Sequence, residues 1–157
     1  MNFHKQLSHA LIAAVCLAAV SSFVFARPDD AAKRLTENRR KWSSKAVKNY
    51  HYDFQRICFC VPAYTKPVKI TVRDGVAAQI AHAETGEAVD KARFEIYYTV
   101  DQLFDYIQAA IDKKAYSINA VYDEEMGYPT SVEIDFIKNA IDDEMRFKTG
   151  NLVVEKQ

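Results

Sequence analysis

Two hydrophobic periods alternate along this chain, and their order is the feature that most narrows its fold. Apolar residues recur at helical spacing after Pro28 and again after Thr99, and each such segment is followed by three segments with apolar residues at every second position. Helical spacing is typical of an amphipathic helix, and a period of two is typical of a half-buried strand. The order α-β-β-β-α-β-β-β therefore predicts a two-layer α+β fold, in which about six antiparallel strands carry both helices on one face.

Both predicted helices have recognisable ends. Pro28, followed by two aspartates, suits a first helical turn, and Trp42 is the largest residue through which this helix would pack. Its apolar stripe consists of Leu35, Trp42 and Ala46. In the second helix, Thr99 and Gln102 have the spacing of a capping box. Its stripe consists of Val100, Leu103, Phe104, Ile107, Ala110 and Ile111.

The dipeptide Asp74-Gly75 separates two alternating runs and predicts a β-hairpin. A two-residue loop would pair Arg73 with Val76 and leave the two apolar faces out of step. A three-residue loop instead pairs Val72 with Val76 and places both apolar sets on one face. The alternation therefore favours a type I turn followed by a bulge at Gly75.

Residues 1–26 have the form of a signal peptide, with an apolar run from position 10 to position 25 that ends at Ala26. Cleavage between Ala26 and Arg27 would leave residues 27–157 as a single domain with a core over about 41–154, exported to the periplasm or secreted. A retained membrane anchor is the first alternative, but the run is shorter than the roughly 18–20 apolar residues that span a bilayer. Lipidation of Cys16 is the second, and the large Val15 before it argues against this modification.

Charge is nearly balanced but unevenly distributed. Residues 27–100 hold 14 basic and 9 acidic side chains, against 6 basic and 12 acidic in residues 101–157. The net charge of −1 excludes a general attraction to nucleic acid or to a membrane, and the split predicts faces of opposite sign.

Motifs such as G-x-S-x-G, H-E-x-x-H and the phosphate-binding glycine loop are absent from the sequence. An enzyme is therefore not the favoured class, although an unidentified activity near His51 or His82 stays an alternative.

Cys58 and Cys60 are the two cysteines that remain after cleavage of the leader. An oxidising compartment favours a disulfide between them. Positions two apart in an extended strand lie near the upper limit of about 6.8 Å between the Cα atoms of a disulfide, so the bond requires a local departure from the strand. Buried thiols, a bond between chains and a redox role are the alternatives. A zinc site is weakly supported, because His51 would face away from both cysteines.

Acidic residues suggest a second candidate site. Asp135, Asp142 and Asp143 could converge across the last predicted strand connection and bind calcium, which prefers several carboxylate and carbonyl oxygens. The alternative is a solvated acidic edge that discourages strand pairing with other chains. The spacing of the acidic residues matches no EF-hand loop.

The favoured function is a non-catalytic binding module of the cell envelope with a protein partner. Its predicted contact surface is the turn formed by Met126, Gly127, Tyr128 and Pro129, together with the acidic residues before it. Tyr64, Tyr97 and Tyr128 fall in predicted loops and are the tyrosines that we expect to be exposed for contact. A calcium-responsive protein and an enzyme of unidentified class are the alternatives.

An ordered set of motifs resembles a known family. The set comprises Trp42, Tyr50, Tyr52, Cys58, Cys60, the helix start from Thr99 to Phe104, Gly127, Tyr128, Pro129, Ile134, Asp135, Asp142, Asp143 and Glu144. In this order the motifs are similar to a family of bacterial exported proteins and lipoproteins catalogued as a domain of unknown function, over roughly residues 41–148. The resemblance implies an envelope or secreted location and supplies no activity, cofactor or catalytic residue. Many members look like lipoproteins, a pattern from which Val15 before Cys16 departs.

Overall fold

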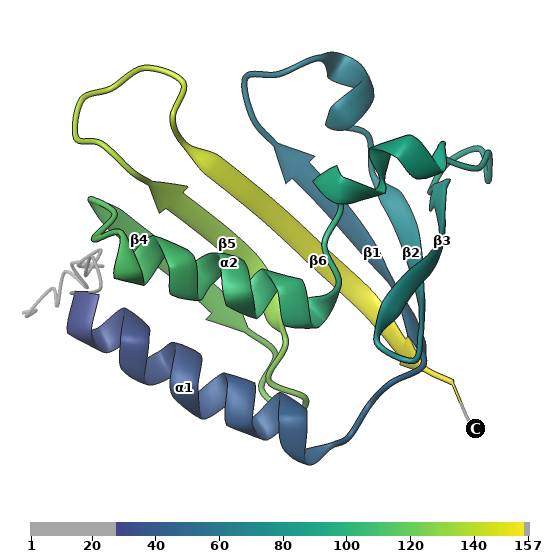
Figure 1. Ribbon diagram of the computed structural model, residues 1–157, viewed down its shortest axis with the longest axis horizontal. Helices are drawn as coiled ribbons and strands as arrows, with labels where there is room; N and C mark the ends of the chain where they lie inside the picture. Colours follow the sequence, from purple (N-terminus) through teal and green to yellow (C-terminus); the bar gives the residue numbers. More distant parts are fainter. Residues whose placement is uncertain (1–27, 156–157) are drawn as a thin grey trace, which may run out of the picture.

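The computed structural model describes residues 28–155, and the predicted leader at residues 1–26 lies outside the described residues. Its elements follow the predicted order (Figure 1): α1 Pro28–Ser44, β1 Tyr50–Ile57, the short 3-10 helix η1 Pro62–Tyr64, β2 Val68–Arg73, β3 Val76–His82, the 3-10 helix η2 Lys91–Ile96, α2 Val100–Asp112, β4 Ser117–Tyr122, β5 Pro129–Asp135 and β6 Met145–Val154. The strands form one sheet in the order β3-β2-β1-β6-β5-β4, and every neighbouring pair is antiparallel. The predicted α+β class is confirmed.

Helices α1 and α2 lie side by side over one half of the sheet (Figure 1). Helix α1 contacts α2 and β4, and α2 contacts β4 and β5. The segment between β3 and α2, which contains η2, covers the other half, where Tyr97 packs edge-on against Phe54 of β1 with 6.0 Å between the ring centroids. A single hydrophobic core therefore lies between the sheet and the two layers that cover it, the helix pair and the segment that contains η2.

The core is rich in aromatic rings because β1 alternates Tyr50, Tyr52 and Phe54 on its covered face, each at most 1 % exposed. Trp42 of α1 packs edge-on against Tyr50 with 5.5 Å between the ring centroids, and its indole N–H donates to Asp101 at 3.2 Å. The prediction that Trp42 anchors the first helix is confirmed. Ala46 does not share its stripe, because α1 ends at Ser44 and Ala46 is exposed with a φ of 51°.

Helix α2 begins with the predicted capping box. The backbone N–H of Gln102 donates to the Thr99 hydroxyl at 3.3 Å, and the backbone N–H of Thr99 donates to the Gln102 side chain at 2.8 Å. These two bonds satisfy backbone donors that a helix start leaves free. The buried stripe of α2 consists of Val100, Leu103, Phe104, Ile107 and Ala110.

The hairpin between β2 and β3 differs from the sequence prediction. Asp74 and Gly75 form a two-residue loop with φ values of 49° and 80°, which is the geometry of a type I′ turn. Arg73 therefore pairs with Val76, and the Val76 side chain is exposed. The predicted three-residue loop is wrong because a mismatch at the turn can be corrected further along the strand.

That correction takes place at Ala78. Val72 pairs with Ala77, whereas Ile70 pairs with Ile80, so β3 carries one extra residue between these two pairs. An extra residue in one strand is a β-bulge, and it shifts the following side chains to the opposite face. As a result, Ile80 is fully buried opposite Ile70.

The sheet face opposite the helices is polar and carries ion pairs. Glu155 contacts Arg73 at 2.5 Å and the ring nitrogen Nδ1 of His51 at 3.2 Å. Hydrogen bonds from Arg73 and then from His51 lower the pKa of the Glu155 carboxyl. Asp53 contacts Lys69 at 3.3 Å. His51 thus belongs to a surface ion-pair cluster rather than to a cleft.

Candidate functional site

Two loops lie at the same end of the sheet. The first follows β1 and the second, residues 136–144, joins β5 to β6. Because β1 and β6 are antiparallel and Ile57 pairs with Arg146, the end of β1 lies beside the start of β6. Figure 1 shows both loops projecting beyond the same end of the sheet. We call residues 58–61 together with 136–144 the loop edge.

The loop edge carries the most exposed large apolar side chains in the described part of the chain. Phe59 is 87 % exposed and Ile141 is 88 % exposed. Val61 and Ile137 are also largely exposed, at 57 % and 63 %. Single exposed apolar residues are common on proteins, whereas a group of them marks a contact surface. This end of the sheet is therefore the candidate binding surface.

A disulfide joins Cys58 and Cys60 within the loop edge, with Cα atoms 5.3 Å apart. The alternation that begins at Tyr50 predicts a strand that continues through both cysteines, and this prediction is wrong because β1 already ends at Ile57. The chain beyond Ile57 bends out of the strand, which brings the two cysteines within bonding distance. Cys60 is exposed, and Cys58 is half-buried.

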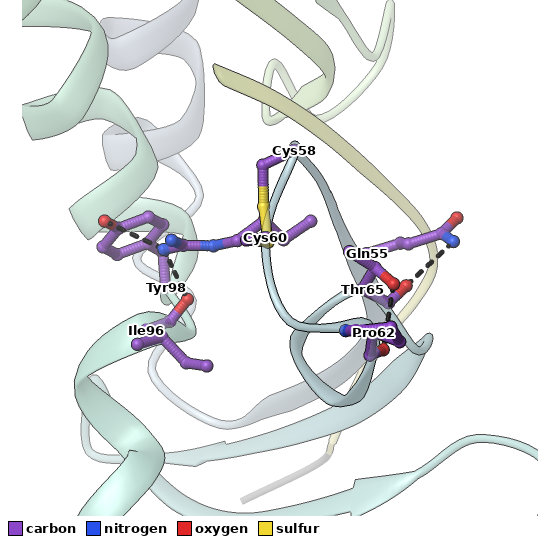
Figure 2. Close-up of a disulfide and its surroundings, with 8 residues drawn as sticks. Gln55, Cys58, Cys60, Pro62, Thr65, Ile96 and Tyr98 are labelled. Carbon is purple, nitrogen blue, oxygen red and sulfur yellow. Dashed lines mark hydrogen bonds between the residues drawn. A yellow bond between two sulfur atoms is a disulfide. The ribbon is translucent and has the colours of Figure 1, made fainter. Parts of the chain in front are cut away.

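On one side, the disulfide loop is fixed by η1. The side-chain amide of Gln55 in β1 donates to the Thr65 carbonyl at 3.1 Å, and the Thr65 hydroxyl donates to the Pro62 carbonyl at 3.0 Å. Figure 2 shows this pair of bonds beside the disulfide. The returning chain is thereby tied to β1 by contacts that do not involve sulfur.

On the other side, the loop is fixed by Arg56. Its guanidinium donates to the Ile96 carbonyl at 2.8 Å and lies over the rings of Tyr98 and Phe147, 5.7 and 5.6 Å from their centroids. An arginine stacked between aromatic rings and bonded to a backbone carbonyl is strongly positioned. Arg56, two positions before Cys58, therefore anchors β1 to the segment between β3 and α2 that covers this strand.

Removing the disulfide is expected to change stability little. Because the cysteines are two positions apart, the chain-entropy relation gives about 1.6 kcal/mol for a closed loop of three residues, roughly half of the value for a 15-residue loop. We expect the double variant Cys58→Ser/Cys60→Ser to unfold in urea with a free energy lower by at most about 1.6 kcal/mol. A loss above about 3 kcal/mol would show instead that the bond holds the fold together.

A shallow depression of about 170 Å³ lies beside the disulfide, lined by Ile57, Cys58, Phe59, Glu144 and Arg146. It contains apolar surface, one sulfur atom and one charge of each sign. Arg146 is held by Glu133 of β5, with 2.7 Å between Nε and Oε1. The depression can thus receive a side chain or a short extended segment next to Cys58.

Asp135 ends β5, whereas Asp142 and Asp143 lie in the loop that joins β5 to β6. In the described residues, no three His, Cys, Asp or Glu side chains come together as metal ligands. The Asp143 carboxylate instead accepts a hydrogen bond from the backbone N–H of Ile137 at 2.7 Å, which closes the loop between β5 and β6. Asp142 is exposed and has a φ of 69°. Oδ1 of Asp135 and Oδ1 of Asp143 are each buried without a hydrogen-bond partner in the described part of the chain. The described residues thus do not group Asp135 with Asp142 and Asp143 as metal ligands.

The predicted contact turn lies at the other end of the sheet and is mostly buried. Tyr128 is only 7 % exposed and packs against Trp42, with 6.4 Å between the ring centroids. Gly127 and Pro129 are buried too, and Met126 is half-buried. Lys41 of α1 donates to the Glu124 carbonyl at 2.7 Å, which ties the turn to the helix. The turn thus supports α1 and offers little free apolar surface.

The loop tyrosines also differ from expectation. Tyr97 is 3 % exposed, and burial raises the pKa of its phenol. Tyr64 is half-buried, with the Arg93 guanidinium 5.9 Å from its ring centroid. Tyr97 covers the core because the segment between β3 and α2 folds back over the sheet, whereas the half-buried Tyr64 of η1 is not part of the core.

Sequence reasoning did not single out Phe59, Ile137 or Ile141. Phe59 was passed over as the residue between two cysteines. The two isoleucines fall in the connection after the alternating strand, where a residue's exposure cannot be read from a period. The one signal in the sequence that could have identified the two isoleucines is that each is an apolar residue in a segment for which no buried face is predicted.

Comparisons with known proteins place the chain in a family. Within residues 28–155, no helix has the length and apolar character needed to cross a membrane. No curated protein and no solved structure matches the chain. The model of a family of unknown function, DUF6174, matches residues 34–154, a range that includes all six strands, α2 and most of α1. The chain therefore belongs to the DUF6174 family of unknown function.

Proposed function

We propose that this protein is an exported binding module, not an enzyme, and that it holds a polypeptide partner against the loop edge. The observation that carries the proposal is the exposure of Phe59 and Ile141 on two loops that the β1–β6 pairing brings to one end of the sheet. Burying a side chain of this size contributes about 1.5–3 kcal/mol. Phe59 lines the depression beside the disulfide, and Ile141 adds a second exposed anchor at the same end of the sheet.

Charge favours a polypeptide over a lipid surface. The second loop carries Lys138 against Asp142, Asp143 and Glu144, a net charge of −2. Anionic lipid headgroups attract basic segments and repel acidic ones. A partner that combines apolar side chains with a positive charge is complementary to the loop edge.

Selection from a library of displayed random 12-residue peptides tests this proposal. We expect the enriched peptides to combine basic and apolar residues, and to bind the Phe59→Ser/Ile141→Ser variant at least tenfold more weakly, since each truncation removes about 1.5–3 kcal/mol of burial. Val76→Ser is the matched control, because Val76 is also largely exposed but lies at the opposite end of the sheet. It should leave the affinity unchanged.

Two results would overturn the proposal. The first is that the selected peptides bind the double variant as well as they bind the unchanged protein. The second is Phe59-dependent binding to phosphatidylglycerol vesicles in the absence of peptide binding. The vesicle test matters because α1 begins at the same end of the sheet (Figure 1), so a retained leader would bring the loop edge toward a membrane.

A further inference from the structure

We propose that the Cys58–Cys60 disulfide is a reactive group that passes its oxidising equivalents to a dithiol of the polypeptide bound at the loop edge. The identity of the acceptor as a bound polypeptide rests on the proposed function. The chemical class of the acceptor is a pair of cysteine thiols with apolar and basic neighbours.

The position of the disulfide makes it accessible. Cys60 is exposed, and Cys58 lines the depression that also contains Phe59 and Arg146. The residue between the cysteines, Phe59, is one of the two proposed anchors. A partner held by the Phe59 side chain would therefore place its own residues next to the two sulfur atoms.

A structural role explains the bond poorly. Both cysteines belong to the same loop and are two positions apart, so the bond joins no two elements of the fold. The chain on both sides of the loop is already fixed, by the contacts of Arg56 with Ile96 and two rings before it and by the bond between Gln55 and Thr65 after it. A pair that can open without loosening the chain around it is suited to exchange.

The reaction is a thiol–disulfide exchange with balanced electrons. A thiolate of the partner attacks Sγ of Cys60, the more exposed of the two residues, forming a mixed disulfide and releasing Cys58 as a thiolate. The second partner thiolate then attacks the partner sulfur of the mixed disulfide and releases Cys60. The partner is oxidised by two electrons to a disulfide, Cys58 and Cys60 are reduced to a dithiol, and the protons of the partner thiols end on the two cysteines or in solvent.

The rate of this exchange can be measured with two probes. The first is dithiothreitol, and the second is a short reduced peptide that has two cysteines next to phenylalanine and lysine. The reference reactant is an oxidised synthetic peptide spanning residues 55–61, which contains the same disulfide ring without the fold. We expect the folded protein to oxidise the dithiol peptide at least tenfold faster than the reference does, with circular dichroism unchanged. Phe59→Ser should remove this advantage, whereas Val76→Ser should preserve both this advantage and the rate with dithiothreitol.

A trapping experiment identifies the attacked sulfur. With the same peptide in its oxidised form, the Cys58→Ser variant should accumulate a mixed disulfide through Cys60, and the Cys60→Ser variant should accumulate at least tenfold less in the same time. Equal trapping by both variants would contradict the assignment of Cys60.

The outcomes separate the two proposals. Binding of the peptide to the Cys58→Ser/Cys60→Ser variant, without accelerated exchange by the unchanged protein, would overturn this inference and leave the binding function standing. The inference would also be overturned if dithiothreitol reduced the Cys58–Cys60 disulfide only in the unfolded protein. Neither binding nor accelerated exchange would overturn both proposals.

Discussion

Gly127→Ala is expected to lower the free energy of unfolding by about 3 kcal/mol. Gly127 has a φ of 82°, a conformation that costs a residue with a Cβ about 1–2 kcal/mol. An added Cβ would also lie 2.7 Å from the backbone oxygen of Asn38 and 3.0 Å from Cβ of Lys41 in α1. The helix would have to move away, and overpacking of this kind typically costs 1–3 kcal/mol. Urea unfolding followed by circular dichroism measures the loss.

Gly75→Ala is the matched control for this prediction. Gly75 has nearly the same φ, 80°, but an added Cβ would meet no atom within 4 Å. We therefore expect a loss of only about 1–2 kcal/mol, from the backbone conformation alone. Equal losses for the two variants would show that α1 does not pack on the turn before β5.

The second large effect is a loss of stability in alkali. Above pH 10 we expect the free energy of unfolding to fall by at least about 2.7 kcal/mol per pH unit, the contribution of two phenols. Tyr50 and Tyr52 are fully buried, and desolvation raises the pKa of both phenols well above 10. In the unfolded chain these phenols lose their protons near pH 10. The folded state then binds more protons than the unfolded state, so stability is complete below pH 10 and is lost as the pH rises toward the folded pKa values.

Tyr52→Phe tests the source of this loss. The variant removes one of the two fully buried phenols, and the slope above pH 10 should become shallower by about 1.4 kcal/mol per pH unit. At neutral pH we expect a loss of about 1 kcal/mol, because the Tyr52 hydroxyl donates to the Tyr98 carbonyl. Urea unfolding at several pH values between 9 and 12 gives both quantities. An unchanged slope would assign the alkaline loss to other groups.

Local patterns were sufficient to predict the elements of this fold. The capping box of Thr99 and Gln102 involves neighbours in sequence, and it forms as predicted. The alternation of Tyr50, Tyr52 and Phe54 indicates a strand with one buried face, and all three are buried. Where the contacts that fix a helix or strand join residues only a few positions apart, the sequence pattern is enough to predict that element.

Contacts between distant segments explain the errors. The extra residue at Ala78 resets the register of β3, and no local signal in an alternating run marks it. Gly127 and Tyr128 looked like an exposed turn, but α1, some 85 residues earlier in the chain, covers them. A loop residue is buried or exposed according to which element packs on it, and that depends on the topology.

In the candidate site too, local features could be predicted from the sequence and contacts between distant segments could not. Cys58 and Cys60 could be selected from the sequence because their chemistry is distinctive and their spacing is short. Phe59 and Ile141 could not be grouped, since they are 82 positions apart and only the pairing of β1 with β6 brings their loops to the same end of the sheet. The acidic residues were grouped by sequence proximity, which did not predict that Asp143 would bond the backbone of Ile137.

The central claim is that this protein binds its partner at the loop edge, and mapping by nuclear magnetic resonance tests it most directly. Backbone amide shifts of the isotope-labelled protein are recorded during titration with a selected basic and apolar peptide. The account predicts that the largest shifts fall at residues 57–61 and 137–146, and that they vanish in the Phe59→Ser/Ile141→Ser variant. Shifts concentrated instead at residues 123–128, on the polar sheet face around His51, or around Val76 would contradict the claim.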